Sequence, residues 1–171
     1  MYRHLWSNGP KEYLEFADYH FDDQFEVAMP SFPPREVLRD YIIGRVEKAG
    51  VNPWVKCNTV VRDCAYDEGS GNFQVRVKDL KTDVEVTEEF THVCVCSGHF
   101  STPHVPHFEG LETFTGRCMH AHDFRSAEEF AGQRLLVIGT SCSAEDIASQ
   151  CYKYGVKSVH LSWRTRPMNF S

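Results

Sequence analysis

The stretch RLLVIGTSCSAEDIASQCYKYGVKSVHLS, residues 134–162, decides the fold of this chain. Arg134–Ile138 is a short apolar run of the kind found in buried strands, and Lys157–Ser162 is a second strand-like segment. Between them, a tight turn at Gly139–Ser143 precedes a helical pattern from Ala144 to Tyr154. Strand, helix and strand within about 30 residues predict a βαβ unit with parallel strands and a right-handed crossover.

The turn after the first strand has a form used for binding dinucleotides. There, Gly-x-Gly-x-x-Gly/Ala lets a pyrophosphate approach the backbone and rest on the N–H groups at the helix start. Gly139 and Ala144 keep the first and last positions. Hydroxyl groups that could reach phosphate oxygens lie between them, on Thr140, Ser141 and Ser143. An ordinary turn capped by Ser143 is the alternative, whereas a serine-hydrolase elbow, Gly-x-Ser-x-Gly, does not fit.

The residues after the second strand indicate which dinucleotide is bound. In this fold an Asp or Glu there binds the ribose 2′-hydroxyl of NAD, and an Arg accommodates the 2′-phosphate of NADP. The chain has Trp163, Arg164, Thr165 and Arg166, with no acidic residue. We therefore expect NADP, with the Arg164 guanidinium and the Thr165 hydroxyl at the phosphate and Trp163 or an arginine on the adenine. A solvated basic turn is the alternative.

The first half of the chain predicts a helix and then an antiparallel meander. Residues 1–30 are loop-like and rich in aromatic side chains. A helix start at Ser31–Pro34 precedes apolar residues at helical spacing from Val37 to Val46, and their face should cover a sheet. Three alternating segments then predict strands, at Asn58–Tyr66, Phe73–Lys78 and Glu85–Phe90.

A further buried strand is expected at His92–Gly98, a continuously apolar run that contains Cys94 and Cys96. Residues 101–116 should form an extended linker. Seven cysteines without an export signal indicate reduced, mostly buried thiols in a cytoplasmic protein. Histidines and cysteines crowd residues 94–122, but none has the paired spacing of a zinc site, so no metal is expected.

Composition limits the classes of function. The chain has 171 residues, of which 42% are hydrophobic and 25% charged, as in globular rather than disordered proteins. It contains no apolar run long enough to span a membrane. The formal net charge of −6 gives no general attraction to nucleic acid or to anionic lipid, so we expect neither a nucleic acid nor a membrane as a partner.

A string upstream of the βαβ unit resembles a family motif. Phe114-Thr-Gly116-Arg-Cys-Met-His120-Ala-His-Asp-Phe124 fits Phe-x-Gly-x-x-x-His-x-x-x-Phe, which resembles the identifying motif of the flavin-containing monooxygenases. In the related Baeyer–Villiger enzymes the last position is usually Trp, so Phe124 favours the branch that oxidises amines and sulfur. The resemblance runs through essentially the whole chain, with further similar stretches at Tyr2–Glu12, Gly98–Pro103, Ser143–Asp146 and Arg164–Met168.

The resemblance implies a fold and a chemistry. The fold would be α/β, with two incomplete doubly wound nucleotide-binding domains (FAD/NAD(P)-binding, Rossmann-like) and an antiparallel β-meander. Residues 1–105 would be a partial FAD-binding domain and residues 106–171 a partial NADP-binding domain. The family reduces FAD with NADPH and adds O2 to give a C4a-hydroperoxyflavin. A small tertiary amine, trimethylamine first of all, would be the substrate.

Carried over by position, the resemblance also implies roles for single residues. Asn8 would contact flavin and nicotinamide and would be the catalytic residue, with a plain turn role as the alternative. Trp6 would help to hold NADP, Val61 would lie against the FAD adenosine, and His120 would be structural. The other cofactor-binding residues would hold NADP, and they are Gly139, Thr140, Ser141, Ser143, Arg164 and Thr165.

The chain departs from the family at two points. Cys142 stands where close relatives usually carry a tyrosine that faces the cofactor pocket. The Gly-rich FAD fingerprint is missing, so the resemblance implies an internal piece of a longer enzyme, inactive by itself. The alternatives are sulfide or Baeyer–Villiger oxygenation, an NADP-binding module without catalysis, and a zinc-dependent interaction module. Whether a homodimer forms is left open.

Overall fold

The computed structural model describes residues 1–164, which form two compact units. The first unit combines Met1–Glu15 and Met29–Val37 with the described residues from Thr102 to Arg164. The second unit combines Phe16–Ala28 with Leu38–Ser101. Each unit is therefore built from segments that lie far apart in the sequence.

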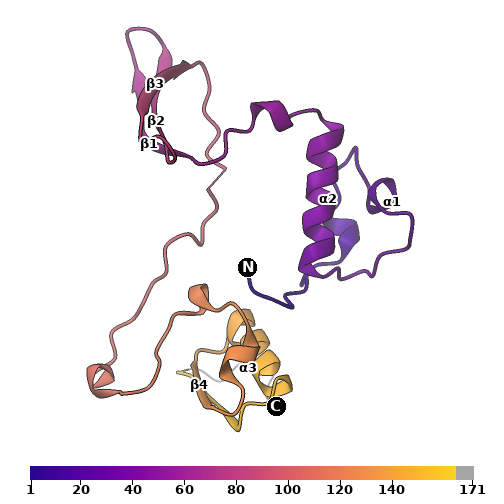
Figure 1. The fold of residues 1–171 in the computed structure, drawn as a ribbon, viewed down its shortest axis with the longest axis vertical. Coiled ribbons are helices and arrows are strands. Elements are labelled where there is room, and N and C mark those ends of the chain that lie inside the picture. Colours follow the sequence, from indigo (N-terminus) through magenta and orange to yellow (C-terminus); the bar gives the residue numbers. More distant parts are fainter. Residues whose placement is uncertain (165–171) are drawn as a thin grey trace. The chain divides into compact units, whose positions relative to one another are not determined.

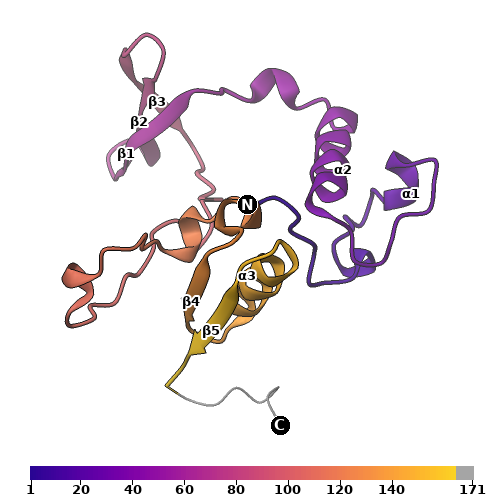
Figure 2. The same ribbon diagram turned by 60° about the horizontal axis from the view of Figure 1, so that its bottom comes forward.

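The first unit contains the expected βαβ arrangement (Figure 2). Strands β4 (Arg134–Ile138) and β5 (Ser158–Ser162) are parallel and in register along their whole length. Helix α3 (Cys142–Lys153) connects them and contacts both strands. The helix begins two residues earlier than expected, and its N-cap is Ser141 rather than Ser143. The prediction of a strand, a turn, a helix and a parallel strand is confirmed.

The core of the first unit lies between α3 and the segment that precedes β4. Phe124 and Phe130 are buried, with their ring centroids 5.9 Å apart. Around them, α3 and the loop that follows it bury Ile147, Cys151 and Val156. Burial raises the pKa of the Cys151 thiol. The described part of this unit also contains four short 3₁₀ helices, η1 (Lys11–Tyr13), η3 (Leu111–Thr113), η4 (Ala121–Asp123) and η5 (Ala127–Phe130).

Helix α2 (Arg35–Lys48) agrees closely with the predicted helix, and all but its first three residues belong to the second unit. Figure 1 shows the short helix α1 (Phe21–Gln24) beside it. The Tyr41 ring of α2 stacks on the Phe21 ring of α1, with centroids 4.1 Å apart, and both side chains are fully buried. Among the described residues, an aromatic segment thus covers α2 where a sheet was expected.

The side chains of Gln24 and Tyr19 lie so close to the backbone of α2 that only a glycine fits at position 44. Gly44 is buried, and a Cβ atom there would collide with Gln24 and with the Tyr19 hydroxyl. The Tyr41 hydroxyl donates a hydrogen bond to the Tyr19 carbonyl, and the Phe16 N–H donates to the Tyr41 oxygen at 2.8 Å. These bonds satisfy the polar end of a buried tyrosine.

The predicted meander is confirmed (Figure 1). Strands β1 (Thr59–Asp67), β2 (Asn72–Asp79) and β3 (Glu85–Phe90) pair antiparallel in the order β1-β2-β3. The 3₁₀ helix η2 (Asn52–Trp54) lies before the sheet. The register between β1 and β2 shifts between Val61 and Asp63, and such a bulge bends the strand locally.

The expected strand at His92–Gly98 is wrong: this run has no regular structure and is exposed. A strand needs a neighbour with free N–H and C=O groups, and no other segment of residues 1–164 pairs with this run. Its Cys94 and Cys96 are therefore exposed, and Cys151 is the single buried cysteine of the seven. The expectation of mostly buried thiols is also wrong. The extended linker after this run is confirmed, apart from η3.

The described part of the chain is thus a mixed α/β structure with one antiparallel and one parallel sheet. The assignment to two incomplete doubly wound domains, divided at residue 105, stays a prediction. No helix within residues 1–164 is long and apolar enough to cross a membrane.

Candidate functional site

The turn between β4 and α3 has the open geometry that a bound phosphate needs. Gly139 has φ of +120°, a backbone conformation that L side chains rarely adopt. A Cβ atom added there would meet nothing within 4 Å. The Gly139 N–H donates to the Ser162 carbonyl at 2.8 Å, which ties the turn to the end of β5. The backbone at Gly139 is therefore both fixed and accessible.

The N-terminus of α3 presents polar groups beside this glycine. The Ser141 carbonyl accepts the N–H groups of Ala144 at 2.8 Å and Glu145 at 3.1 Å, but the Ser141 side chain makes no capping bond. Thr140 is half-buried, and Ser141 and Ser143 are exposed. The first amides of a helix have no partner inside it, and the helix dipole favours an anion there. An ordinary turn capped by Ser143 is not what the structure contains.

Arg164 follows β5 by two residues and is exposed. Since β4 and β5 are parallel, Gly139 and Arg164 both follow the carboxyl ends of their strands, at one edge of the sheet. Thr165 lies outside the described residues. The structure therefore places the Gly139 turn and Arg164 at the same edge of the sheet, as the predicted dinucleotide site requires. Their roles stay predictions.

The segment that carries Trp6 and Asn8 belongs to the same unit. Trp6 forms an isolated antiparallel bridge with Pro34, and the Ser7 N–H donates to the Pro33 carbonyl at 2.9 Å. The side chains of Trp6 and Asn8 are exposed, and their contact with a cofactor stays a prediction. Val61 is exposed beside the bulge in β1 and belongs to the second unit.

The motif that carries the resemblance has a structural part. Phe124, its last residue, is 3% exposed and packs edge-on against Tyr2 with centroids 5.2 Å apart. His120 is the N-cap of η4, and its Nδ1 accepts the His122 N–H at 3.0 Å. The motif thus shapes the chain before β4, in keeping with a structural His120. Within residues 1–164, no three His, Cys, Asp or Glu side chains converge on a metal-sized site.

A polar network between the N-terminus and α3 was missed by the sequence reasoning. Asp146 accepts a hydrogen bond from the Tyr2 hydroxyl, and Gln150 joins Asp146 to the backbone of His4. Burial, and secondly the bond and the charge of Asp146, raise the pKa of the Tyr2 phenol. Two polar residues four apart on the buried side of a helix were the available signal.

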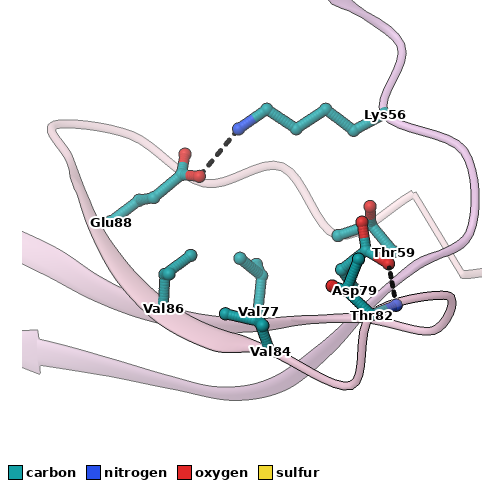
Figure 3. A pocket seen from close by; sticks show the side chains of 8 residues that line it. All are labelled: Lys56, Thr59, Val77, Asp79, Thr82, Val84, Val86 and Glu88. Atoms are coloured by element: carbon teal, nitrogen blue, oxygen red, sulfur yellow. Dashed lines mark hydrogen bonds and ion pairs between the residues drawn. The ribbon is translucent and has the colours of Figure 1, made fainter.

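The meander carries a separate surface pocket of about 350 Å³. Figure 3 shows Val77, Val84 and Val86 along its floor and the ion pair of Lys56 with Glu88, 2.7 Å long, across it. At one end, the Asp79 carboxylate accepts the Thr82 N–H at 2.9 Å, and turn amides lower the pKa of Asp79. The polar groups of this pocket are thus already paired, and none of the predicted site residues lines it.

Comparison with known proteins identifies a family that matches nearly the whole chain. The family model described as flavin-binding monooxygenase-like matches residues 1–168. Trimethylamine monooxygenase of Methylocella silvestris is 62% identical over 170 residues, which are 99% of this chain and 38% of that protein. The chain thus spans about 38% of the length of the curated trimethylamine monooxygenases that it matches.

Solved structures of oxygenases are also similar to this chain. The crystal structure of Tmm from Pelagibacter sp. strain HTCC7211 has a TM-score of 0.93 at 51% identity, over 100% of this chain and 38% of that one. S-allyl-L-cysteine S-oxygenase from Allium sativum has a TM-score of 0.86 at 30% identity, over 100% of this chain and 39% of that one.

Proposed function

The chain belongs to the flavin-binding monooxygenase-like family, and on that premise we propose that it is part of an FAD- and NADPH-dependent amine monooxygenase. One oxygen atom of O2 would be transferred to the nitrogen of a small tertiary amine, with trimethylamine as the first candidate. The other oxygen atom leaves as water, and NADPH supplies the two electrons. The observation that carries the proposal is the similarity to trimethylamine monooxygenases along the whole chain.

The chemistry of the residues around Gly139 supports NADP as the dinucleotide. The backbone at Gly139 and the α3 N-terminus suit a pyrophosphate, and hydroxyls of Thr140, Ser141 and Ser143 lie beside them. Arg164, together with Thr165, would bind the 2′-phosphate by charge-assisted hydrogen bonds. In this proposal the residues bind and orient the dinucleotide, and their fixed backbone limits the entropy lost on binding.

Two exposed residues of the N-terminal segment would act nearer to the reacting centre. Trp6 would pack against NADP, and the Asn8 amide would both donate and accept hydrogen bonds at the nicotinamide and flavin. Val61 would contact the adenosine of FAD. FAD, when bound, supplies the oxygen-transfer chemistry, and the protein supplies position and exclusion of water.

The cysteines favour the cytoplasm as the place of this activity. All seven are free, and six of them are exposed. Exposed free thiols persist in reducing compartments, which are also where disulfides are rare.

A chimera tests the proposal directly. Residues 1–170 would replace the corresponding segment of the Methylocella silvestris trimethylamine monooxygenase, with that enzyme unaltered as the control. We expect the chimera to bind FAD and to form one trimethylamine N-oxide for each NADPH consumed. Parallel assays would use dimethyl sulfide and cyclohexanone in place of the amine.

Flavin content separates a folding failure from a functional one. A chimera that binds FAD but gives no N-oxide contradicts the amine assignment. Sulfoxide as the preferred product would support sulfide oxygenation, and a lactone would support the Baeyer–Villiger reaction.

Replacing Asn8 by aspartate in the chimera should uncouple the reaction. The carboxylate cannot donate the hydrogen bond that the amide donates, so N-oxide formed per NADPH should fall roughly tenfold, as the loss of one such bond predicts. FAD content should not change. Asn58→Asp makes the same substitution at another exposed asparagine and should have no effect. Normal coupling in Asn8→Asp would leave Asn8 with a turn role only.

A further inference from the structure

The N-terminal segment is held to α3 by a network that centres on one carboxylate. Oδ2 of Asp146 accepts the Tyr2 hydroxyl, and it also accepts Nε2 of Gln150 at 3.1 Å. Nε2 of Gln150 in turn donates to the His4 carbonyl at 3.3 Å. Asp146 and Gln150 are four residues apart, so they lie on one side of the helix. One helical turn therefore holds two residues of the segment.

Burial raises the free-energy cost of breaking the hydrogen bonds of this network. Gln150 is 7% exposed, and its Oε1 is buried without a partner in the described part of the chain. Polar groups in such surroundings lose more when a bond is broken than exposed groups do. The Tyr2 ring lies edge-on to Phe124, which keeps its hydroxyl directed at Asp146. Moving the segment would therefore break hydrogen bonds that are partly buried.

The backbone of the segment shows the same restraint. His4 has φ of +62°, which is uncommon for a residue with a side chain. The His4 ring stacks on the Tyr154 ring, with centroids 5.3 Å apart, and the His4 carbonyl accepts the hydrogen bond from Gln150. These two contacts stabilise the backbone conformation of His4. On either side, the Arg3 N–H donates to the Arg125 carbonyl at 2.8 Å and the Ser7 N–H to the Pro33 carbonyl at 2.9 Å.

We propose that Asp146 is a positioning residue that fixes the segment carrying Trp6 and Asn8 to the helix whose N-terminus receives the NADP pyrophosphate. This inference rests on the proposed function. Asp146 lies on the same rigid helix as the phosphate-binding amides, about one turn from its start. The helix therefore sets the distance between the two ends of the dinucleotide site. In this proposal Asp146 acts through its bonds to Tyr2 and Gln150.

Two probes of different length test this role on the 171-residue chain. NADP⁺ would reach both the Arg164 end and the Trp6–Asn8 segment, whereas 2′,5′-ADP reaches only the Arg164 end. Asp146→Ala should weaken NADP⁺ binding about tenfold, the effect of losing one hydrogen bond to the ligand, and leave 2′,5′-ADP binding unchanged. Tyr2→Phe keeps the ring packing but loses the donor, so it should weaken NADP⁺ binding by a smaller factor.

Amide hydrogen exchange measures, without any ligand, how firmly the N-terminal segment is held to α3. In Asp146→Ala the Arg3 and Ser7 amides should exchange about tenfold faster, while amides of β4 and β5 keep their rates. Asp146→Asn still offers an oxygen to Tyr2 and Gln150, and it should restore both readouts. Glu145→Ala, which removes the same charge from the neighbouring exposed position, should leave these exchange rates as in the wild type.

The exchange rates and the two binding measurements together test the positioning role of Asp146. Unchanged exchange in Asp146→Ala overturns the anchoring, and equal losses for NADP⁺ and 2′,5′-ADP reduce Asp146 to general stability. Faster exchange with unchanged NADP⁺ binding also overturns the positioning role. If the wild-type chain binds neither probe, the proposed NADP site fails, and the exchange rates still report whether Asp146 anchors the segment.

Discussion

Replacing Arg164 by alanine is expected to weaken NADPH binding roughly 10- to 100-fold, because charge-assisted hydrogen bonds to a phosphate contribute about 1.5–3 kcal/mol. NADH has no 2′-phosphate, so its binding should not change. The measurement is the KM for each cofactor in the chimera, together with titration of the 171-residue chain with 2′,5′-ADP.

Arg134 provides the matched control for this prediction. It is exposed at the opposite end of the same pair of parallel strands, where Arg134 of β4 lies beside Ser158 of β5. Arg134→Ala removes the same charge and should alter neither cofactor. Equal losses for NADPH and NADH in Arg164→Ala would contradict the phosphate assignment and leave Arg164 in a solvated basic turn.

Replacing Phe21 by alanine should destabilise the second unit by about 3–5 kcal/mol, the usual loss for a fully buried phenylalanine. Its ring is 0% exposed and stacks on Tyr41, so truncation leaves a cavity against α2. Urea unfolding followed by the near-ultraviolet circular dichroism of the aromatic side chains measures the effect. Unfolding should occur at a clearly lower urea concentration.

Phe100→Ala is the control that separates the effect of burial from the loss of an aromatic ring as such. It belongs to the same unit and is 81% exposed, so Phe100→Ala should change stability by less than about 0.5 kcal/mol. Similar midpoints for Phe21→Ala and Phe100→Ala would mean that the aromatic stack of Phe21 and Tyr41 does not hold this unit together.

Where the local pattern and the packing agree, the sequence predicted the fold well. The period of the apolar residues, and the glycines and prolines between them, gave β1 to β5, α2 and α3 to within about two residues, since each element repeats its side-chain directions with a fixed period. The Gly139 turn was likewise visible, because only a glycine adopts its φ of +120° readily.

The errors arose where an element depends on a distant partner. The apolar run His92–Gly98 has the composition of a buried strand, but composition does not provide the neighbouring strand that its backbone needs. The face of α2 was correctly read as covered, yet its cover is the aromatic side chains of Phe21 and Tyr19 and not a sheet.

The order of residues alone establishes the βαβ unit, the meander and the chemical types at the candidate dinucleotide site. Folding in three dimensions adds the contacts between residues more than 100 positions apart, such as Tyr2 with Asp146. The periodicity of the sequence does not predict such a pair. The stabilisation that the pair provides depends on burial and bond geometry, which exist only after the two segments have come together. The placement of Trp6 and Asn8 is therefore a property of the tertiary structure.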